Sequence, residues 1–177
     1  MRPLPTQDLL QWLLHYDPKT GVFIWKSGTT NGKRKAGDIA GSIASNGYRL
    51  IGVCGGQFAA HRLAWVYVYG ADPDTFEIDH IDGNPLNNAI ANLRLATSAE
   101  QKRNKTVQKN NRSGLKGAYF HACHKGKKWR SQIKVGNVLQ FLGYFHTAQE
   151  AHEAYREASL RLEGEFSYFA RDERKSA

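Results

Sequence analysis

The 177-residue sequence has few cysteines and no long apolar run. Cys54 and Cys123 are its two cysteines. Two are too few for a disulfide framework or for a four-cysteine zinc site, so we expect free thiols and no structural zinc. No apolar run approaches transmembrane length, and the first residues, MRPLPTQD, lack the profile of a signal peptide. These absences predict a cytoplasmic protein that has no membrane partner.

Acidic residues are missing from one long segment. Between Gln101 and Gln149 there is no Asp or Glu, while eleven Lys and Arg lie between Lys102 and Lys134. The formal net charge of the chain is +9. A basic block gains free energy on nucleic acid phosphates through the release of counterions. A solvated basic face or a membrane-surface segment would carry the same charge, but the second of these lacks a long basic amphipathic helix.

The segment 76–105 carries most of the recognisable chemistry. A strand-like run, 76–78, leads to the adjacent pair Asp79 and His80. The loop that follows, 82–88, is rich in Asp, Gly, Asn and Pro, and such residues end a strand. Adjacent residues on a strand point to opposite faces unless the strand breaks. We therefore expect a break at this pair, as the turn after it suggests.

A second strand and a helix complete this unit. Residues 92–96 alternate polar and apolar side chains, and Thr97 with Glu100 forms a capping box that opens a helix. Gln101 and Asn104 then lie one turn apart on that helix. The predicted order is strand, loop, strand and helix.

This combination of residues suits the hydrolysis of a phosphodiester. A carboxylate with an amide oxygen from the helix makes a sparse oxygen site that leaves positions for water and phosphate, which suits Mg²⁺. The imidazole of His80 can take a proton from an attacking water, while a metal stabilises the phosphate charge and the leaving oxygen. An Asp-His pair alone is more often a surface feature, so the hypothesis depends on the joint spacing of all these residues.

At these positions the chain resembles the HNH endonucleases, specifically the phage and intron homing type built on the ββα-metal motif. The resemblance lies in AAHRLAWVYVYG, EIDHIDGNPLNN and NLRLATSAEQKRN, with YDPKTGVFIWK and SNGYRLIGV before them. It implies that His80 is the general base and that Asp79 is a metal ligand. It also implies that Asn92 holds the loop and orients His80, and that the protein acts in a microbial or phage-infected cell.

The helix position differs from the pattern of that family. Relatives carry Asn or His in the register of Gln101, whose amide stands on a side chain one methylene longer. Either the metal lies further out or Asn104 provides the ligand. The implied cofactor is one divalent ion, Mg²⁺, with Mn²⁺ as the alternative. Arg62, Arg103 and Lys105 are the expected DNA contacts in this part of the chain.

Turn and capping signals predict further small elements before this unit, which together make an α+β domain with small antiparallel strands. They are a helix over 7–15 capped by Thr6, a strand over 22–25, strands over 39–43 and 48–53 joined at Ser45-Asn46-Gly47, and a turn at Gly55-Gly56 leading to 58–60. A helix over 61–69 that ends at Gly70 is placed there partly because the resemblance to the HNH endonucleases implies it, since the segment is rich in β-branched and aromatic residues.

After a linker the pattern changes to three strands and one helix. The strands are predicted over 117–121, 128–135 and 138–145, with a turn at Gly136-Asn137, and the helix starts with a capping box of Thr147 and Glu150 and stops at Gly164. Alternation on the second strand separates an apolar set from a row of donors suited to phosphates and base edges. The apolar set is Trp129, Ser131, Ile133 and Val135, and the donors are Lys128, Arg130, Gln132 and Lys134.

Residues 111–169 resemble the plant APETALA-type (ethylene-response) DNA-binding domain. The resemblance lies in Lys116–Tyr119, Trp129–Ile133, Leu142–Phe145 and Gln149–Arg156. It implies a three-stranded antiparallel sheet packed on one helix. The expected contacts with double-stranded DNA are Lys116, Tyr119, Lys128, Arg130, Gln132 and Lys134. The predicted organisation is a nuclease domain at 1–105, a linker at 106–114, a DNA-binding domain at 115–170 and a tail at 171–177.

The hypothesis from sequence is a metal-dependent HNH endonuclease of the homing type that hydrolyses phosphodiester bonds in double-stranded DNA. It would act as a monomer or homodimer, and no protein partner is implied. The alternative is a non-catalytic, sequence-specific DNA-binding protein on a degenerate HNH scaffold, and Gln101 is the feature that favours it. A structural or RNA-binding module is a third class, with less support because no pair of base-stacking aromatics is evident.

Overall fold

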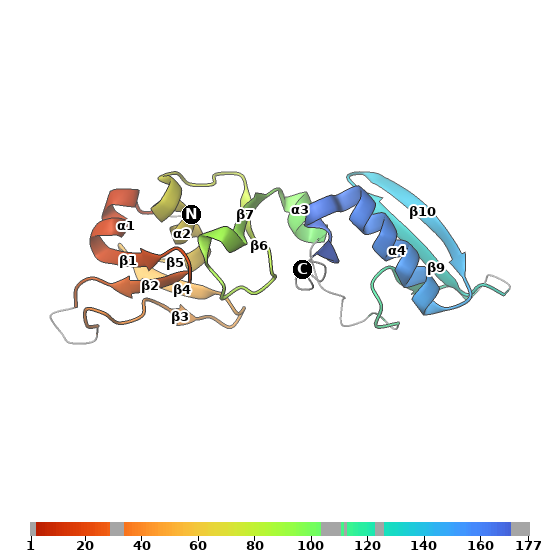
Figure 1. Ribbon diagram of the computed structural model, residues 1–177, viewed down its shortest axis with the longest axis horizontal. Coiled ribbons are helices and arrows are strands. Elements are labelled where there is room, and N and C mark those ends of the chain that lie inside the picture. The colour runs from red at the N-terminus through yellow and green to blue at the C-terminus, as the bar shows by residue number, and fades with distance from the viewer. Residues whose placement is uncertain (1–2, 29–33, 104–110, 112, 123–125, 171–177) are drawn as a thin grey trace. The chain divides into compact units, whose positions relative to one another are not determined.

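The computed structural model describes residues 3–28, 34–103, 111, 113–122 and 126–170 (Figure 1). Asn104, Lys105, Cys123, most of the predicted linker and the predicted tail lie outside these residues. By its internal contacts the chain divides into two compact units, residues 1–97 and 98–177. The functional boundaries predicted at 105 and 115 stay predictions. In the described part of the chain, no helix has the length and apolar character that crossing a membrane requires.

The first unit is a mixed α/β structure with small antiparallel sheets. β1 pairs with β2, β4 lies between β3 and β5, and β6 pairs with β7. Its elements are α1 (Gln7–Leu13), β1 (Leu14–Asp17), β2 (Val22–Trp25), β3 (Ser42–Ile43), β4 (Arg49–Val53), β5 (Gly56–Ala59), α2 (Ala60–Tyr69), β6 (Glu77–His80), the single 3₁₀ turn η1 (Ile90–Asn92) and β7 (Leu93–Ala96).

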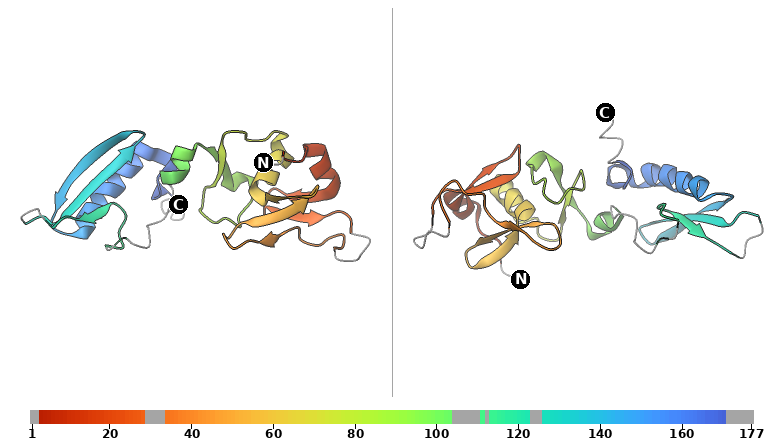
Figure 2. Two further views of the ribbon diagram at one scale, coloured as in Figure 1. Left: turned by 180° about the vertical axis from the view of Figure 1, so that it is seen from behind. Right: turned by 90° about the horizontal axis from the view of Figure 1, so that it is seen from below.

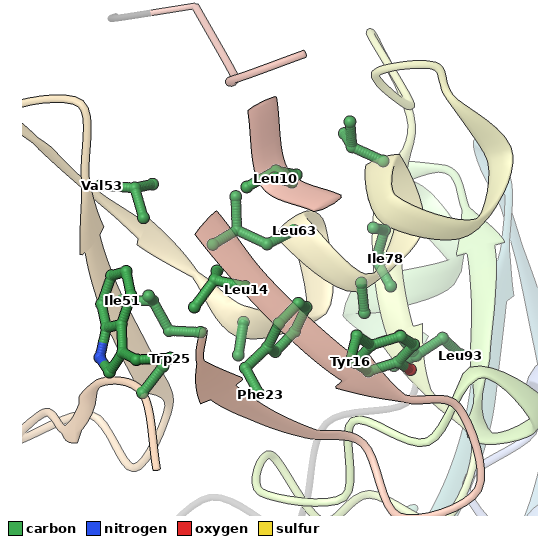
Figure 3. Packing of buried hydrophobic residues seen from close by; sticks show 14 residues of the cluster. Leu10, Leu14, Tyr16, Phe23, Trp25, Ile51, Val53, Leu63, Ile78 and Leu93 are labelled. Atoms are coloured by element: carbon green, nitrogen blue, oxygen red, sulfur yellow. The ribbon is translucent and has the colours of Figure 1, made fainter. Parts of the chain in front are cut away.

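One hydrophobic core joins the elements of this unit (Figure 3). Ile78 of β6 and Leu93 of β7 belong to it, so the strand pair that carries Asp79 and His80 is anchored by apolar packing. The buried members are Leu10, Leu14, Tyr16, Phe23, Trp25, Ala40, Ile51, Val53, Ala60, Leu63, Ala64, Val66, Ile78 and Leu93.

The N-terminal helix is shorter than predicted. Thr6 caps it as expected, since its Oγ1 accepts a hydrogen bond from the backbone N–H of Leu9 at 3.4 Å. α1 ends at Leu13, however, and His15 lies in β1. Pairing with β2 overrides the helical pattern there, because the strand buries Tyr16 and leaves His15 exposed.

The predicted hairpins form, one of them with a shifted turn. β3 and β4 are joined through Ser45-Asn46-Gly47, as predicted. Between β4 and β5 the turn is Cys54-Gly55 and not Gly55-Gly56, because Val53 pairs with Gly56. Both turn residues have positive φ, 52° and 70°, which a two-residue hairpin turn of the primed kind requires.

The second unit is a three-stranded antiparallel sheet, ordered β8-β9-β10, packed on one helix (Figure 2). The hydroxyl of Thr147 accepts a hydrogen bond from the N–H of Glu150 at 3.1 Å, so the predicted cap forms. The Glu150 carboxylate accepts from the N–H of His146, one residue before Thr147, and not from the N–H of Thr147 itself as in a capping box. The elements are α3 (Ser98–Arg103), β8 (Ala118–Phe120), β9 (Trp129–Val135), β10 (Val138–Phe145), α4 (Ala148–Glu163) and the 3₁₀ turn η2 (Gly164–Phe166).

Candidate functional site

Asp79 and His80 lie on an unbroken strand. Their register with β7 continues through the pair, with Asp79 opposite Arg94 and His80 opposite Leu93. The predicted strand break at this pair is therefore wrong, and β6 ends only after His80. Both side chains are buried, and because they are adjacent on a strand they enter different surroundings on the two faces.

The carboxylate of Asp79 forms an ion pair with Arg94. The guanidinium Nε and Nη2 donate to Asp79 Oδ2 at 3.1 and 2.8 Å. The two side chains retain only 6% and 11% of their accessible surface. An unbalanced charge at this depth would be costly, so Arg94 stabilises the buried carboxylate.

The imidazole of His80 lies against two other rings. The ring centroid of His61, on α2, is 5.1 Å away at an interplanar angle of 87°, and that of Tyr48 is 5.9 Å away. Tyr48 and His61 also contact each other, with centroids 5.3 Å apart. Burial, with smaller contributions from His80 and Arg62, lowers the pKa of His61 to about 3. His61 is therefore a neutral neighbour of His80 at physiological pH.

Asn88 contacts His80 on its Nε2 atom. Asn88 Oδ1 lies 3.2 Å from His80 Nε2, and Asn88 Nδ2 donates to the carbonyl of Leu86 at 3.1 Å. Because Nδ2 is engaged with a carbonyl, the oxygen of the amide faces His80, and an oxygen can only accept. His80 Nε2 therefore carries the proton, which makes Nδ1 the basic nitrogen of the neutral ring.

The turn between β1 and β2 holds Asn88 in place. The hydroxyl of Tyr16 donates to the Asn88 carbonyl at 2.7 Å, and burial raises the pKa of Tyr16, which keeps it a donor. Gly21 has φ +73°, and a Cβ built on it would stand 2.2 Å from the carbonyl carbon of Asn88. Only glycine fits there. The hydrophobic core thus reaches His80 through Tyr16 and Asn88.

Asn92 braces the loop between β6 and β7. It lies in η1, just before β7 and not in the strand as predicted. Its Oδ1 accepts from the N–H of Asp82 at 3.0 Å, and its Nδ2 donates to Asp82 Oδ1 and to the carbonyl of Asn87. Burial opposes the ionisation of Asp82, but hydrogen bonds from Asn87, Asn84 and Asn92 outweigh it and lower the pKa of the carboxyl.

Three side chains that were not among the predicted site residues contact His80. Asn88, Tyr48 and His61 contact His80, whereas the hydrogen bonds described for Asn92 go to the loop. The role of Asn92 in orienting His80 stays a prediction, and the geometry supplies an indirect route, because Asn87, which Asn92 holds, is adjacent to Asn88. In the sequence, Asn88 is one of several asparagines in a loop rich in turn residues, and nothing there indicates that it contacts His80.

The predicted helix ligand lies on α3. Gln101 is half-buried on this helix, which belongs to the second unit and packs against η2. Its assignment as a metal ligand stays a prediction, and Asn104 lies outside the described residues.

The predicted DNA contacts lie in several places. Arg62 pairs with Asp72, and the ammonium of Lys116 lies 4.3 Å from the ring centroid of Tyr168. Arg103 is the last residue of α3, Lys128 precedes β9, and Lys105 lies outside the described residues. The residues of the β8–β10 sheet are Tyr119, Arg130, Gln132 and Lys134.

The chemistry of Asp79 fits a hard divalent cation. A carboxylate is a preferred ligand of Mg²⁺, and Mg²⁺ tolerates few protein ligands because it keeps several waters. Among residues with a described position, no group of three His, Cys, Asp or Glu could hold a metal ion. The metal site predicted at Asp79 stays a prediction, and Arg94 already pairs with that carboxylate.

This strand pair and its asparagine-rich loop surround a buried histidine with a defined basic nitrogen. Residues 58–103, from the end of β5 through α2, β6 and β7 to α3, match the family model of the HNH endonucleases. This segment of the chain is therefore similar to the HNH endonucleases.

Comparison with individual proteins gives partial matches. Protein 3.8 of Escherichia phage T7 is 51% identical over 73 residues, which are 41% of this chain and 59% of that protein. The uncharacterized HNH endonuclease L560 of Acanthamoeba polyphaga mimivirus is 26% identical over 113 residues, 63% of this chain and 57% of that protein. A structure of DNA binding and cleavage by the HNH homing endonuclease I-HmuI matches with 28% identity and a TM-score of 0.36, over 50% of this chain and 47% of that chain. The chain thus spans less than two thirds of these relatives.

Proposed function

We propose that the protein is a metal-dependent endonuclease of the homing type, which hydrolyses phosphodiester bonds in double-stranded DNA. The observation that carries this proposal is the buried imidazole of His80, whose Nε2 is engaged by Asn88 within a segment that matches the HNH endonucleases. The nuclease domain is taken as residues 1–105.

In the proposed reaction, His80 Nδ1 accepts a proton from the attacking water. Proton transfer makes the ring a cation, and the amide oxygen of Asn88 then accepts a stronger, charge-assisted hydrogen bond from Nε2–H. The rings of Tyr48 and His61 contact the His80 imidazole and limit its movement. The neutral state of His61 avoids a second positive charge beside the imidazolium.

A divalent ion would stabilise negative charge on the phosphate and on the leaving oxygen. Asp79 would hold it, together with an amide oxygen from Gln101 or Asn104. Mg²⁺ is the expected ion and Mn²⁺ the alternative, because both are hard cations that prefer oxygen ligands. Arg94 fixes the orientation of the Asp79 carboxylate through two donors on one oxygen.

Residues 115–170 are proposed as an APETALA-type domain that binds duplex DNA. The support is a sheet with one face on α4 and a row of Arg130, Gln132 and Lys134 on the other. The further contacts proposed are Arg62, Arg103, Lys105, Lys116, Tyr119 and Lys128.

A second candidate function is a DNA-binding protein without nuclease activity. The observations that favour it are Gln101 at the helix position and the ion pair that Arg94 makes with Asp79, because a metal must share this carboxylate. Incubating long duplex DNA with the protein in Mg²⁺, in Mn²⁺ and in EDTA separates the two candidates. The nuclease produces breaks in at least one of these ions and none in EDTA, whereas the binding protein retards the DNA and leaves it intact in all three.

Replacing Asn88 with alanine is expected to lower the cleavage rate about 10- to 100-fold, with the affinity for DNA unchanged, because the variant leaves His80 Nε2–H without its acceptor. Single-turnover cleavage gives the rate, and ¹⁵N NMR of His80 reports the loss of the fixed tautomer. Asn137→Ala is the control, since Asn137 is an exposed asparagine in the turn between β9 and β10, outside this loop. An Asn88→Ala rate equal to that of the control would contradict the role of Asn88.

Replacing Arg130 and Lys134 together with alanine is expected to weaken DNA binding and to flatten its salt dependence. Each lost phosphate contact reduces the slope of log K against log salt by about 0.9. Fluorescence anisotropy at several salt concentrations measures both quantities. Arg161→Ala, an exposed change on α4, should leave the slope as it is. A double variant with the wild-type slope would remove these residues from the interface.

A further inference from the structure

The sheet of the second unit has one covered face and one open face. Ala118, Ser131 and Ile133 are almost completely buried on the side of α4. Residues directly opposite each other in an antiparallel sheet share a face. The strand register therefore assigns to the other side, called the open face from here on, the residues Tyr119, Arg130, Gln132, Lys134, Leu139, Phe141 and Tyr144.

The open face carries apolar and aromatic side chains on its outer strands. On β10, Leu139 and Phe141 are 58% and 54% exposed, and on β8 Tyr119 is 49% exposed. The rings of Phe141 and Tyr144 contact each other, with centroids 5.2 Å apart. The sequence does not indicate this grouping, because a bulge between Phe141 and Gly143 shifts the alternation along β10.

Charge on the open face favours a polyanion as its partner. Arg130 and Lys134 stand on the central strand, and no Asp or Glu occurs anywhere between Gln101 and Gln149. The exposed acids Glu150, Glu153 and Glu157 lie on α4, which packs on the covered face. An apolar protein partner would have to desolvate the cations of the open face without compensation.

The arrangement of side chains favours a duplex over a single strand. Platforms for single strands present aromatic rings on which bases stack. Here the long cationic side chains of the central strand stand between the rings of the two outer strands. A small sheet of this kind can enter the major groove, where cations reach phosphates and guanine edges.

We propose that Leu139 and Phe141 read the C5-methyl groups of thymines in the major groove. The inference rests on the proposed binding of duplex DNA by this unit. Thymine is the one ordinary base that presents an apolar group in this groove. Leu139 lies opposite Lys134 and Phe141 opposite Gln132, so each apolar residue has a polar neighbour that can fix the register on the DNA. Contact with the methyl groups removes exposed apolar surface of both partners from water.

Deoxyuridine provides the test, because it differs from thymidine only in lacking the methyl group. The full-length protein is first used to select a tight-binding duplex from a random pool. Each thymine of that duplex is then replaced singly by deoxyuridine. We expect at least one replacement to weaken binding about 3- to 5-fold, the effect of one buried methyl. The alanine variant of the residue that contacts this thymine, Phe141→Ala or Leu139→Ala, should bind the two forms of that duplex equally.

Val138→Ala is the matched control for these variants. Val138 is also exposed on β10, but it lies opposite Val135, so its side chain points to the same side of the sheet as the covered face. This variant should keep the preference for thymine, and circular dichroism verifies that all three variants fold.

The outcomes separate this inference from the function on which it rests. If the wild-type protein binds the selected duplex but no deoxyuridine replacement weakens binding, or if the selected site contains no thymine, methyl reading is wrong and duplex binding stands. If no duplex is selected, or a single strand of the same sequence binds more tightly, the proposed function of this unit fails as well.

Discussion

Replacing His80 with alanine is expected to lower the rate of DNA cleavage by about 10²- to 10⁴-fold, the usual contribution of a general base. The variant loses the nitrogen that accepts the proton of the attacking water, while the DNA contacts proposed on the second unit are untouched. Single-turnover cleavage at saturating Mg²⁺ gives the rate, and anisotropy in the presence of EDTA gives the affinity, which should stay within about twofold of the wild type.

His15→Ala is the matched control for this experiment. His15 is an exposed histidine on β1 of the same unit, so its replacement tests whether the loss of any imidazole matters. It should cleave at the wild-type rate. Wild-type cleavage by His80→Ala would exclude His80 as the base, and a large loss of DNA affinity would indicate a structural effect.

Replacing Gly21 with alanine is expected to lower the free energy of unfolding of the first unit by about 3 kcal/mol or more, and to slow cleavage. A positive φ costs an alanine about 1 kcal/mol. The larger part of the effect is overlap, because the new Cβ would stand 2.2 Å from the carbonyl carbon of Asn88 and must displace that residue from His80. Urea denaturation of the full-length protein measures the change.

Gly37→Ala separates the two causes. Gly37 also has a positive φ, +88°, but a Cβ built there meets no atom of the described residues within 4 Å. This control should show only the conformational cost of about 1 kcal/mol and normal cleavage. Equal losses in the free energy of unfolding for the two variants would mean that overlap with Asn88 adds nothing to the destabilisation by Gly21→Ala.

Local signals predicted much of the fold. The helices capped by Thr6 and Thr147, the Gly136-Asn137 turn and the alternation on β9 depend on neighbours in the sequence, and the structure contains all of them. β1 was missed because its apolar residues continue the helical stripe of α1. Only its pairing with β2, through side chains that the sequence does not place together, distinguishes the two structures.

The environment of the candidate site was less predictable. Tyr48, His61 and Asn88 come from three separate segments, and they meet at His80 only after the core has formed. The partner of Asp79 depends on the register of β6 with β7, because a shift of one residue would place another side chain opposite it. Spacing indicated which residue types matter, but not which hydrogen bond fixes the tautomer of His80.

The ion pair between Asp79 and Arg94 bears on how the site would respond to metal. Arg94 places a positive charge next to the carboxylate that a divalent ion would use. If Asp79 holds the ion as proposed, the affinity for the ion in the absence of DNA is expected to be weak, because the two charges repel each other and share one ligand. DNA phosphates near the site would reduce this repulsion and favour joint binding of ion and substrate.

The most direct test of the central claim is the conversion of supercoiled plasmid DNA by the purified protein, followed over time in Mg²⁺ and in EDTA. The account predicts nicked or linear DNA in Mg²⁺, none in EDTA, and almost none with His80→Ala in either solution. A plasmid that stays supercoiled in Mg²⁺ and in Mn²⁺, while the protein binds it tightly, would contradict the nuclease assignment and favour a DNA-binding protein on an HNH scaffold.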